Sequence, residues 1–208
     1  MAGQLFTANR GGRSYELLRR RSWVVCLVLF GAIAFPVLGG SPSNDFSEYQ
    51  VKAAFLFNFA KFVEWPASAY ATGSSPVSIC VLGDNPFSDS LEKAVAGQST
   101  NGRPLVVRQV ESPKEAGDCN MVFVCPSEQG HFTQIIGNLQ GKSVLTVADA
   151  DAFAEQGGMI QFYIENNRVR FEVNVNACTH AHLKVSSKLL ALAKIVSGGA
   201  STAGEGKD

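Results

Sequence analysis

The sequence predicts an α/β fold with a mostly parallel sheet and helices on both faces, of the doubly wound, Rossmann-like kind. A C-terminal antiparallel hairpin and a final helix complete this prediction. Four short apolar runs alternate with helix-compatible segments between residues 76 and 148, and parallel strands need crossover connections that helices usually provide. Two later runs alternate apolar and polar residues around a polar turn, which indicates a hairpin with one wet face.

The longest helix-compatible segment, residues 47–63, precedes this alternation and is rich in aromatic residues. Ser47 is suited to cap its N-terminus, and Pro66 forbids its continuation. At helical spacing, one apolar stripe comprises Val51, Phe55, Phe59 and Phe62, and a second comprises Ala53, Leu56, Phe57, Ala60 and Val63. The polar remainder comprises Lys52, Asn58, Lys61 and Glu64. So wide an apolar surface predicts burial on more than one side, either within the domain or against another chain.

The alternating region follows this helix. Its apolar, β-branched runs predict strands at 76–83, 105–110, 119–125 and 144–148. Helices are expected at 87–95 and 132–139, with one helical turn in the polar segment 111–118. The four strands would form the parallel part of the sheet, with the first helix covering part of it.

The C-terminal region changes pattern. Residues 159–164 and 169–175 alternate apolar and polar side chains around the turn 165–168, and they predict the antiparallel hairpin. Residues 181–196 predict the final helix, because Leu183 and Leu190 fall on one face while the lysines point outward. The last residues, 198–208, are small and polar, so we expect a disordered tail.

The N-terminal region has the order of a secretory signal. Arg19 to Arg21 precede an uncharged run, residues 23–38, which is followed by small and polar residues. The run is short for a membrane span, which needs about 20 apolar residues. We therefore expect residues 1–40 to be a cleaved signal peptide with its cleavage zone, residues 41–197 to form a single domain, and the mature protein to be exported.

Charge and cysteine usage narrow the function classes. The formal net charge is zero at pH 7, so the sequence lacks the basic field of a nucleic-acid-binding protein. Loss of Cys26 with the signal leaves four cysteines, which allow three disulfide connectivities in an oxidising compartment. The cysteines lack close CxxC spacing, and His180 and His182 alternate. We therefore expect no metal and no cofactor.

The ends of the predicted strands carry polar side chains at one rim of the sheet, where open α/β sheets bind ligands. These are Asp84, Asn85, Ser127, Glu128 and Asp149. The same residue types are those that helix caps and turns require. No nucleophile elbow and no phosphate-binding glycine loop follows a strand in the sequence. The sequence thus argues against an enzyme, and it leaves a small-molecule crevice at this rim as an alternative function.

Several segments, in this order, resemble the YfiR family of bacterial periplasmic proteins across Glu48 to Val196. They are YQVKAAFLFNFAKFVEWP, ICVLGDNPF, VLTVAD followed by GGMIQF, VRFEVNVNA and LKVSSKLLALAKIV. The resemblance implies a periplasmic negative regulator without catalysis, which forms a homodimer. It would repress the sensor domain of an inner-membrane signalling protein, a diguanylate cyclase or a sensor kinase, and so act in cyclic-di-GMP signalling and biofilm formation.

The resemblance also implies a disulfide between Cys80 and Cys119, and adjacent first and third strands would place these residues within disulfide reach. The second family disulfide lies near residues 147–158, where this chain has no Cys. Cys125 and Cys178 would then form a second pair or stay free. The partner interface is expected on the leftover apolar faces of the first and final helices, at Phe55, Phe57, Phe59, Phe62, Trp65 and Leu190.

Overall fold

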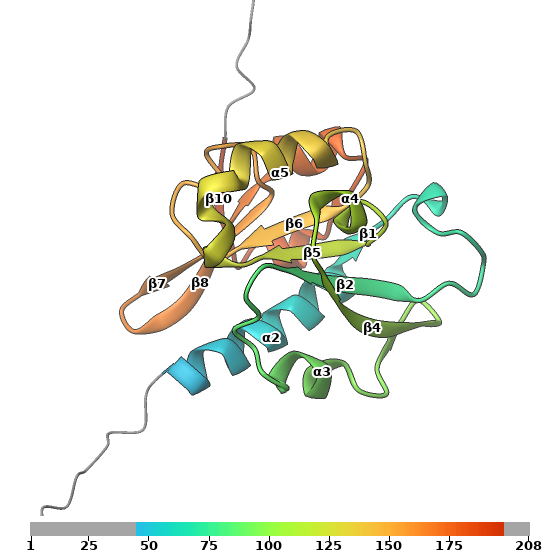
Figure 1. Cartoon of the computed structure of the whole chain (residues 1–208), viewed down its shortest axis with the longest axis horizontal. Coiled ribbons are helices and arrows are strands. Elements are labelled where there is room, and N and C mark those ends of the chain that lie inside the picture. The colour runs from blue at the N-terminus through green and yellow to red at the C-terminus, as the bar shows by residue number, and fades with distance from the viewer. Residues whose placement is uncertain (1–44, 198–208) are drawn as a thin grey trace, which may run out of the picture. The chain divides into compact units, whose positions relative to one another are not determined.

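An eight-stranded mixed sheet organises residues 45–197, the part of the chain described by the computed structural model (Figure 1). Its strand order is β10-β8-β7-β6-β5-β2-β4-β3. The parallel part consists of β2 (Val77–Leu82), β4 (Arg103–Val110), β5 (Met121–Val124), β6 (Leu145–Ala148) and β7 (Ile160–Glu165). Their order, β4-β2-β5-β6-β7, is one that doubly wound sheets adopt. The predicted α/β class with a mostly parallel sheet is confirmed.

Three further strands complete the two edges of the sheet. On one side, β8 (Arg168–Asn174) pairs antiparallel with β7, and β10 (Lys194–Val196) pairs in parallel with β8. On the other side, β3 (Ser99–Thr100) pairs antiparallel with β4. A separate two-stranded ladder joins β1 (Val63–Glu64) to β9 (Lys184–Val185).

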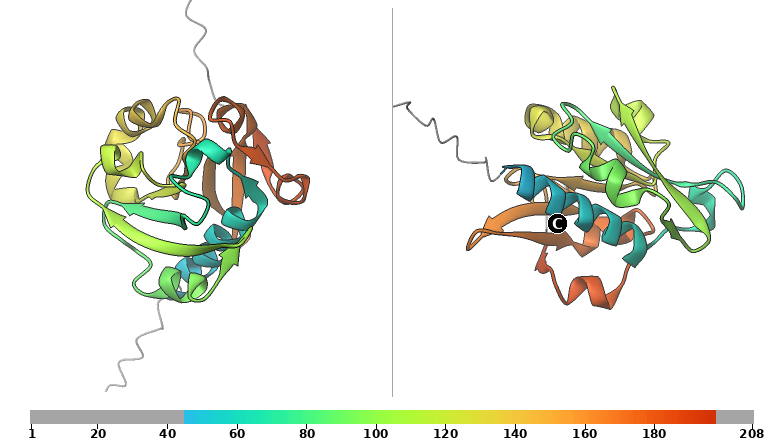
Figure 2. Two further views of the ribbon diagram at one scale, coloured as in Figure 1. Left: turned by 90° about the vertical axis from the view of Figure 1, so that its right-hand side faces the viewer. Right: turned by 90° about the horizontal axis from the view of Figure 1, so that it is seen from below.

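Helices lie on both faces of the sheet (Figures 1 and 2). The sheet therefore separates two layers of hydrophobic core. One face carries α2 (Asp45–Phe62) and α3 (Ser90–Val95), and the other carries α4 (Pro113–Ala116) and α5 (Phe132–Leu139). Two 3-10 turns, η1 (Ala67–Ala69) and η2 (Pro126–His131), link elements. Side chains of β2 alternate between the layers, with Ile79 on the α2 side and Cys80 on the α5 side. Burial on both faces explains why β2 reads as a continuous apolar run.

The aromatic stripe of α2 fastens this helix to the β7–β8 hairpin. Phe59 is fully buried, and its ring centroid lies 5.7 Å from that of Phe162 and 5.0 Å from that of Phe171. Phe55 lies 6.0 and 5.4 Å from the same two rings. Because Phe162 and Phe171 are register partners, the four rings form one cluster that joins three elements.

The predicted cap at Ser47 is wrong. Helix α2 includes Asp45, so Ser47 lies inside the helix. At the other end, Val63 and Glu64 leave the helix to pair with β9 before Pro66. The helix therefore ends where a strand partner takes over the backbone hydrogen bonds, slightly ahead of the proline.

The predicted final helix is also wrong. Residues 181–196 contain β9, the short helix α7 (Ser187–Leu190) and β10, and another short helix, α6 (Val175–His180), precedes them. The Ser186 side chain accepts a hydrogen bond from the backbone of Lys188 and starts α7 there. On both sides of α7 the backbone pairs with β1 and β8. These long-range partners override the local helical periodicity, as tertiary context often does.

The predicted signal peptide, residues 1–40, and the predicted tail, residues 198–208, lie outside the described residues. Within residues 45–197, no helix has both the length and the apolar character that crossing a membrane requires.

Candidate functional site

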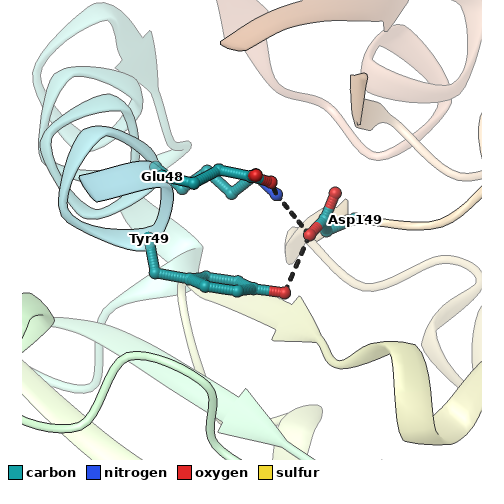
Figure 3. A network of polar contacts seen from close by, with 4 residues as sticks. Glu48, Tyr49 and Asp149 are labelled. Carbon is teal, nitrogen blue, oxygen red and sulfur yellow. Dashed lines mark hydrogen bonds and ion pairs between the residues drawn. The ribbon is translucent and has the colours of Figure 1, made fainter. Parts of the chain in front are cut away.

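A partly buried polar cluster joins α2 to the carboxyl end of β6 (Figure 3). Asp149 directly follows β6, and its carboxylate accepts hydrogen bonds from the hydroxyl of Tyr49, at 3.0 Å, and from the ammonium of Lys52. Lys52 also pairs with Glu48, one turn earlier on α2. The Lys52 side chain is 0% exposed, so its charge is balanced entirely by these carboxylates and by the face of the Tyr49 ring, 4.6 Å from its nitrogen.

Helical spacing explains how α2 supplies three members of this cluster. Glu48 and Lys52 are four residues apart and share a face with Tyr49. The Tyr49 ring packs edge-on against Phe87, with centroids 5.5 Å apart. Burial and the neighbouring carboxylate of Asp149 raise the pKa of Tyr49 well above its usual value. The Tyr49 hydroxyl therefore remains a neutral donor, and the cluster acts as a structural latch between helix and sheet.

Sequence reasoning missed the role of Lys52, which it placed only in the polar remainder of the helix. The signals that could have found it are the Glu48–Lys52 spacing and the carboxylate at the end of a predicted strand. Neither signal by itself shows that the two groups meet, because Lys52 and Asp149 lie 97 residues apart in the sequence.

The other residues of the predicted crevice also have partners within the chain. The Ser127 hydroxyl accepts from the backbone N–H of Asp84 at 2.9 Å. Asn85 accepts from the backbone N–H of Phe87 at 2.9 Å, and Glu128 lies 3.2 Å from the His131 ring. The Asn85 and Glu128 contacts are local to their turns, and the Ser127 bond joins η2 to the turn after β2, so these side chains have structural roles at this rim.

The predicted disulfide is present between Cys80 and Cys119, with the Cα atoms 6.2 Å apart. Cys80 lies in β2, and Cys119 lies just before the adjacent strand β5. The prospective second pair does not form, because Cys125 and Cys178 are both free and buried. Cys125 follows β5, and Cys178 lies in the helix after β8. Strands β6 and β7 separate β5 from β8, a distance of about 14 Å that exceeds disulfide reach.

These two free thiols predict a loss of stability at alkaline pH. Burial raises the pKa of both Cys125 and Cys178 from 9.0 to about 12, and Asp84 and Glu128 add to the effect at Cys125. Above about pH 9 the unfolded chain loses these protons while the folded chain keeps them. The free energy of unfolding should therefore fall between about pH 9 and 12, by up to about 1.4 kcal/mol per pH unit for each thiol.

Urea unfolding between pH 8 and pH 10.5 would measure this effect. In the double variant Cys125→Ala/Cys178→Ala, the free energy of unfolding should fall less steeply with pH. The fall that remains would include the contribution of Tyr49, whose pKa is also raised. An equally steep fall in the double variant would show that the thiols are not the source.

The predicted interface residues fall into two groups. Phe55, Phe57, Phe62, Trp65 and Leu190 are half-buried and pack against the edge of the core. Phe59 is fully buried, so its side chain packs beneath the others and is not accessible to a partner. The indole N–H of Trp65 donates to the backbone oxygen of Asn120 at 2.8 Å, which fixes that side chain against the loop before β5.

Several exposed apolar side chains lie near Phe55, on α2, on the β7–β8 hairpin and on β10, which pairs with β8. We call this set the apolar flank and define it as Val51, Phe55, Ile164, Val169 and Ile195. Val51 is 41% exposed, Ile164 50% and Ile195 52%. Val51 lies one turn from Phe55, Ile164 pairs with Val169, and Ile195 pairs with Val173 of the same sheet face. Large exposed apolar side chains that adjoin one another indicate a contact surface.

Comparison with known proteins identifies a family whose model matches this chain. A family model described as YfiR/HmsC-like matches residues 49–194. A solved structure, a conserved domain protein from Vibrio cholerae O1 biovar El Tor, is similar at 12% identity with a TM-score of 0.44. That match covers 57% of this chain and 54% of the other, so the chain spans about half the length of that protein. The family match, which covers most of the described fold, is the stronger finding.

Proposed function

The chain belongs to the YfiR/HmsC-like family, and we propose that it is a periplasmic regulatory protein in cyclic-di-GMP signalling. In this proposal it binds and represses the periplasmic sensor domain of an inner-membrane protein. The partner that we propose is a diguanylate cyclase. The observation that supports docking by protein contact is the apolar flank, because the chain carries large exposed apolar side chains next to its aromatic cluster.

Charged side chains alternate with the flank residues along the same strands, so they lie on the opposite face of the sheet. The tip of the hairpin carries Glu165 and Arg170, whose charged groups lie 3.8 Å apart and are largely exposed. At the sheet edge, Lys194 lies 3.0 Å from Glu172. In this proposal the apolar side chains of the flank would supply most of the binding energy, and these charges would lie outside the contact.

The polar groups of the chain give weaker support to the alternative function, a small-molecule crevice at the strand ends. The side-chain oxygens of Asn85, Ser127 and Asp149 already accept hydrogen bonds within this chain. A ligand that used those three side chains would have to displace their internal hydrogen bonds. A catalytic role faces the same difficulty, and we therefore propose regulation by binding.

Charge placed on the apolar flank should weaken docking. We expect Ile164→Glu and Val51→Glu each to weaken binding to the sensor domain by about tenfold or more, and the double variant to release the cyclase from repression. Both side chains are substantially exposed, so the fold should tolerate the change. The measurements are the affinity for the purified sensor domain of the cyclase and the cyclic-di-GMP formed in membranes that contain the full-length enzyme.

Gln134→Glu is a matched control, since it adds the same carboxylate to an exposed position of α5, on the opposite face of the sheet. It should bind and repress like the wild type. Sedimentation analysis of each variant would show whether the flank also joins two copies of this chain. Unchanged affinity and repression in the folded Val51→Glu/Ile164→Glu protein would refute this assignment of the docking surface.

A further inference from the structure

A second surface feature lies away from both the flank and the strand-end rim. It is a cavity of about 920 Å³ between α5, the segment that leads into β7, and α6. This volume lies in the range of cavities that hold small molecules, about 300–1,000 Å³. The apolar side chains that line it include Ile136 and Met159, and its polar rim includes Gln140, Gln156 and Asn176.

The charge of the lining restricts what could bind. No Asp, Glu, Lys or Arg lines the cavity among the residues that the structure describes, and His180 is its one titratable side chain there. A charged ligand would lose its hydration without gaining an opposite charge. The rim amides can both donate and accept hydrogen bonds. Within the described residues, the side chains of Gln140 and Asn176 have no hydrogen-bond partner, so both are free to bind a neutral polar group.

Gly137 provides an independent observation. It lies inside helix α5 and lines the cavity. Glycine is among the least favourable residues for a helix interior. A Cβ atom added at this position would meet no atom of the described chain within 4 Å, and its backbone is not in the left-handed region. The packing of the chain therefore does not require a glycine here, whereas close approach of a ligand to the helix backbone would.

From these observations we propose that the cavity binds an uncharged small molecule with a carboxamide or similar donor–acceptor edge on an apolar body. The carboxamide edge would meet Gln140 and Asn176, and the apolar body would lie on Ile136 and Met159 with one side against Gly137. This site is separate from the proposed docking surface, and it does not depend on that proposal.

Methionine methyl groups give a direct readout of binding. The chain contains three methionines, of which Met159 lines the cavity and Met121 is fully buried in the core. In protein labelled with ¹³C-methyl methionine, we would titrate two isosteric pairs, benzamide with benzoate and cyclohexanecarboxamide with cyclohexanecarboxylate. We expect the amides to shift the Met159 signal saturably, with the Met121 signal unchanged and the carboxylates without effect. The Met159→Leu variant assigns the signal.

Gly137→Ala separates binding from folding. The substitution should raise the melting temperature by about 2 °C, because alanine favours the helix, and it should weaken amide binding by about tenfold. Gly130→Ala is the matched control, since it adds the same methyl group with no atom within 4 Å, just before α5 and outside the cavity. It should leave amide binding unchanged.

Three results would overturn the proposal. They are a Met159 signal that no amide shifts, equal shifts with the carboxylates, and full amide binding by Gly137→Ala.

Discussion

Replacing Lys52 with alanine should destabilise the protein by about 3 kcal/mol or more, because it leaves the carboxylate of Asp149 without its cation in a largely buried site. The backbone of α2 would keep its helical form, but the helix would lose its charged contact with the sheet. Urea unfolding followed by circular dichroism would measure the change in the free energy of unfolding.

A double-mutant cycle would assign this loss to the ion pair. Lys52→Met/Asp149→Asn removes both charges while keeping an acceptor for the Tyr49 hydroxyl, so it should recover a large part of the stability lost in Lys52→Met. Lys93→Met is the control, because it removes a lysine from an exposed ion pair within a helix. Lys93 and Asp89 are 73% and 69% exposed, and an exposed pair contributes about 0–1 kcal/mol. Equal losses at Lys52 and Lys93 would contradict the latch.

Removing the disulfide should cost about 4 kcal/mol, as the chain-entropy relation gives for a loop of this length. The two cysteines are separated by 39 residues, and the loop between them contains β4 and α4. Cys80→Ala/Cys119→Ala should unfold at lower urea concentration, since the unfolded chain regains the freedom that the bond removes. Alanine avoids the buried hydroxyl groups that serine would introduce at these sites.

A reducing agent provides the complementary test. Dithiothreitol should destabilise the wild type to the level of Cys80→Ala/Cys119→Ala, and it should not affect that variant further. Cys125→Ala/Cys178→Ala, which retains the disulfide, should still respond to the reductant. If mass analysis shows complete reduction of the wild type with an unchanged unfolding midpoint, the bond does not contribute to stability.

Local patterns in the sequence predicted most of the sheet and its helices. The apolar run that contains Ile79 and Val81 forms β2, and the helix expected at 132–139 is α5 with the same bounds. Such runs are reliable for β2, β5 and β6 because these strands are buried along their length, so their composition reflects their environment directly. The resemblance to the family was equally informative, and it implied the Cys80–Cys119 bond that the structure contains.

The candidate sites were less predictable. Phe59 and Phe55 belong to the same apolar stripe, yet Phe59 is fully buried while Phe55 reaches the surface. The stripe shows that both side chains avoid water, but the hairpin opposite decides which of them is covered. Val51 was part of the same predicted stripe, but the exposure of Val51 and of Ile164 was not predicted, because nothing local distinguishes an exposed apolar side chain from a buried one.

By itself, the sequence determined the α/β class, the family and the strands of the parallel sheet, because these depend on the order and periodicity of apolar residues. Only the tertiary structure decided the burial of Lys52, the free state of Cys125 and Cys178, and the strand pairing within residues 181–196. Each of these depends on a group that is distant in the sequence and adjacent in the fold. Asp149 meets Lys52 only once the sheet has formed, and β10 is a strand only because β8 lies beside it.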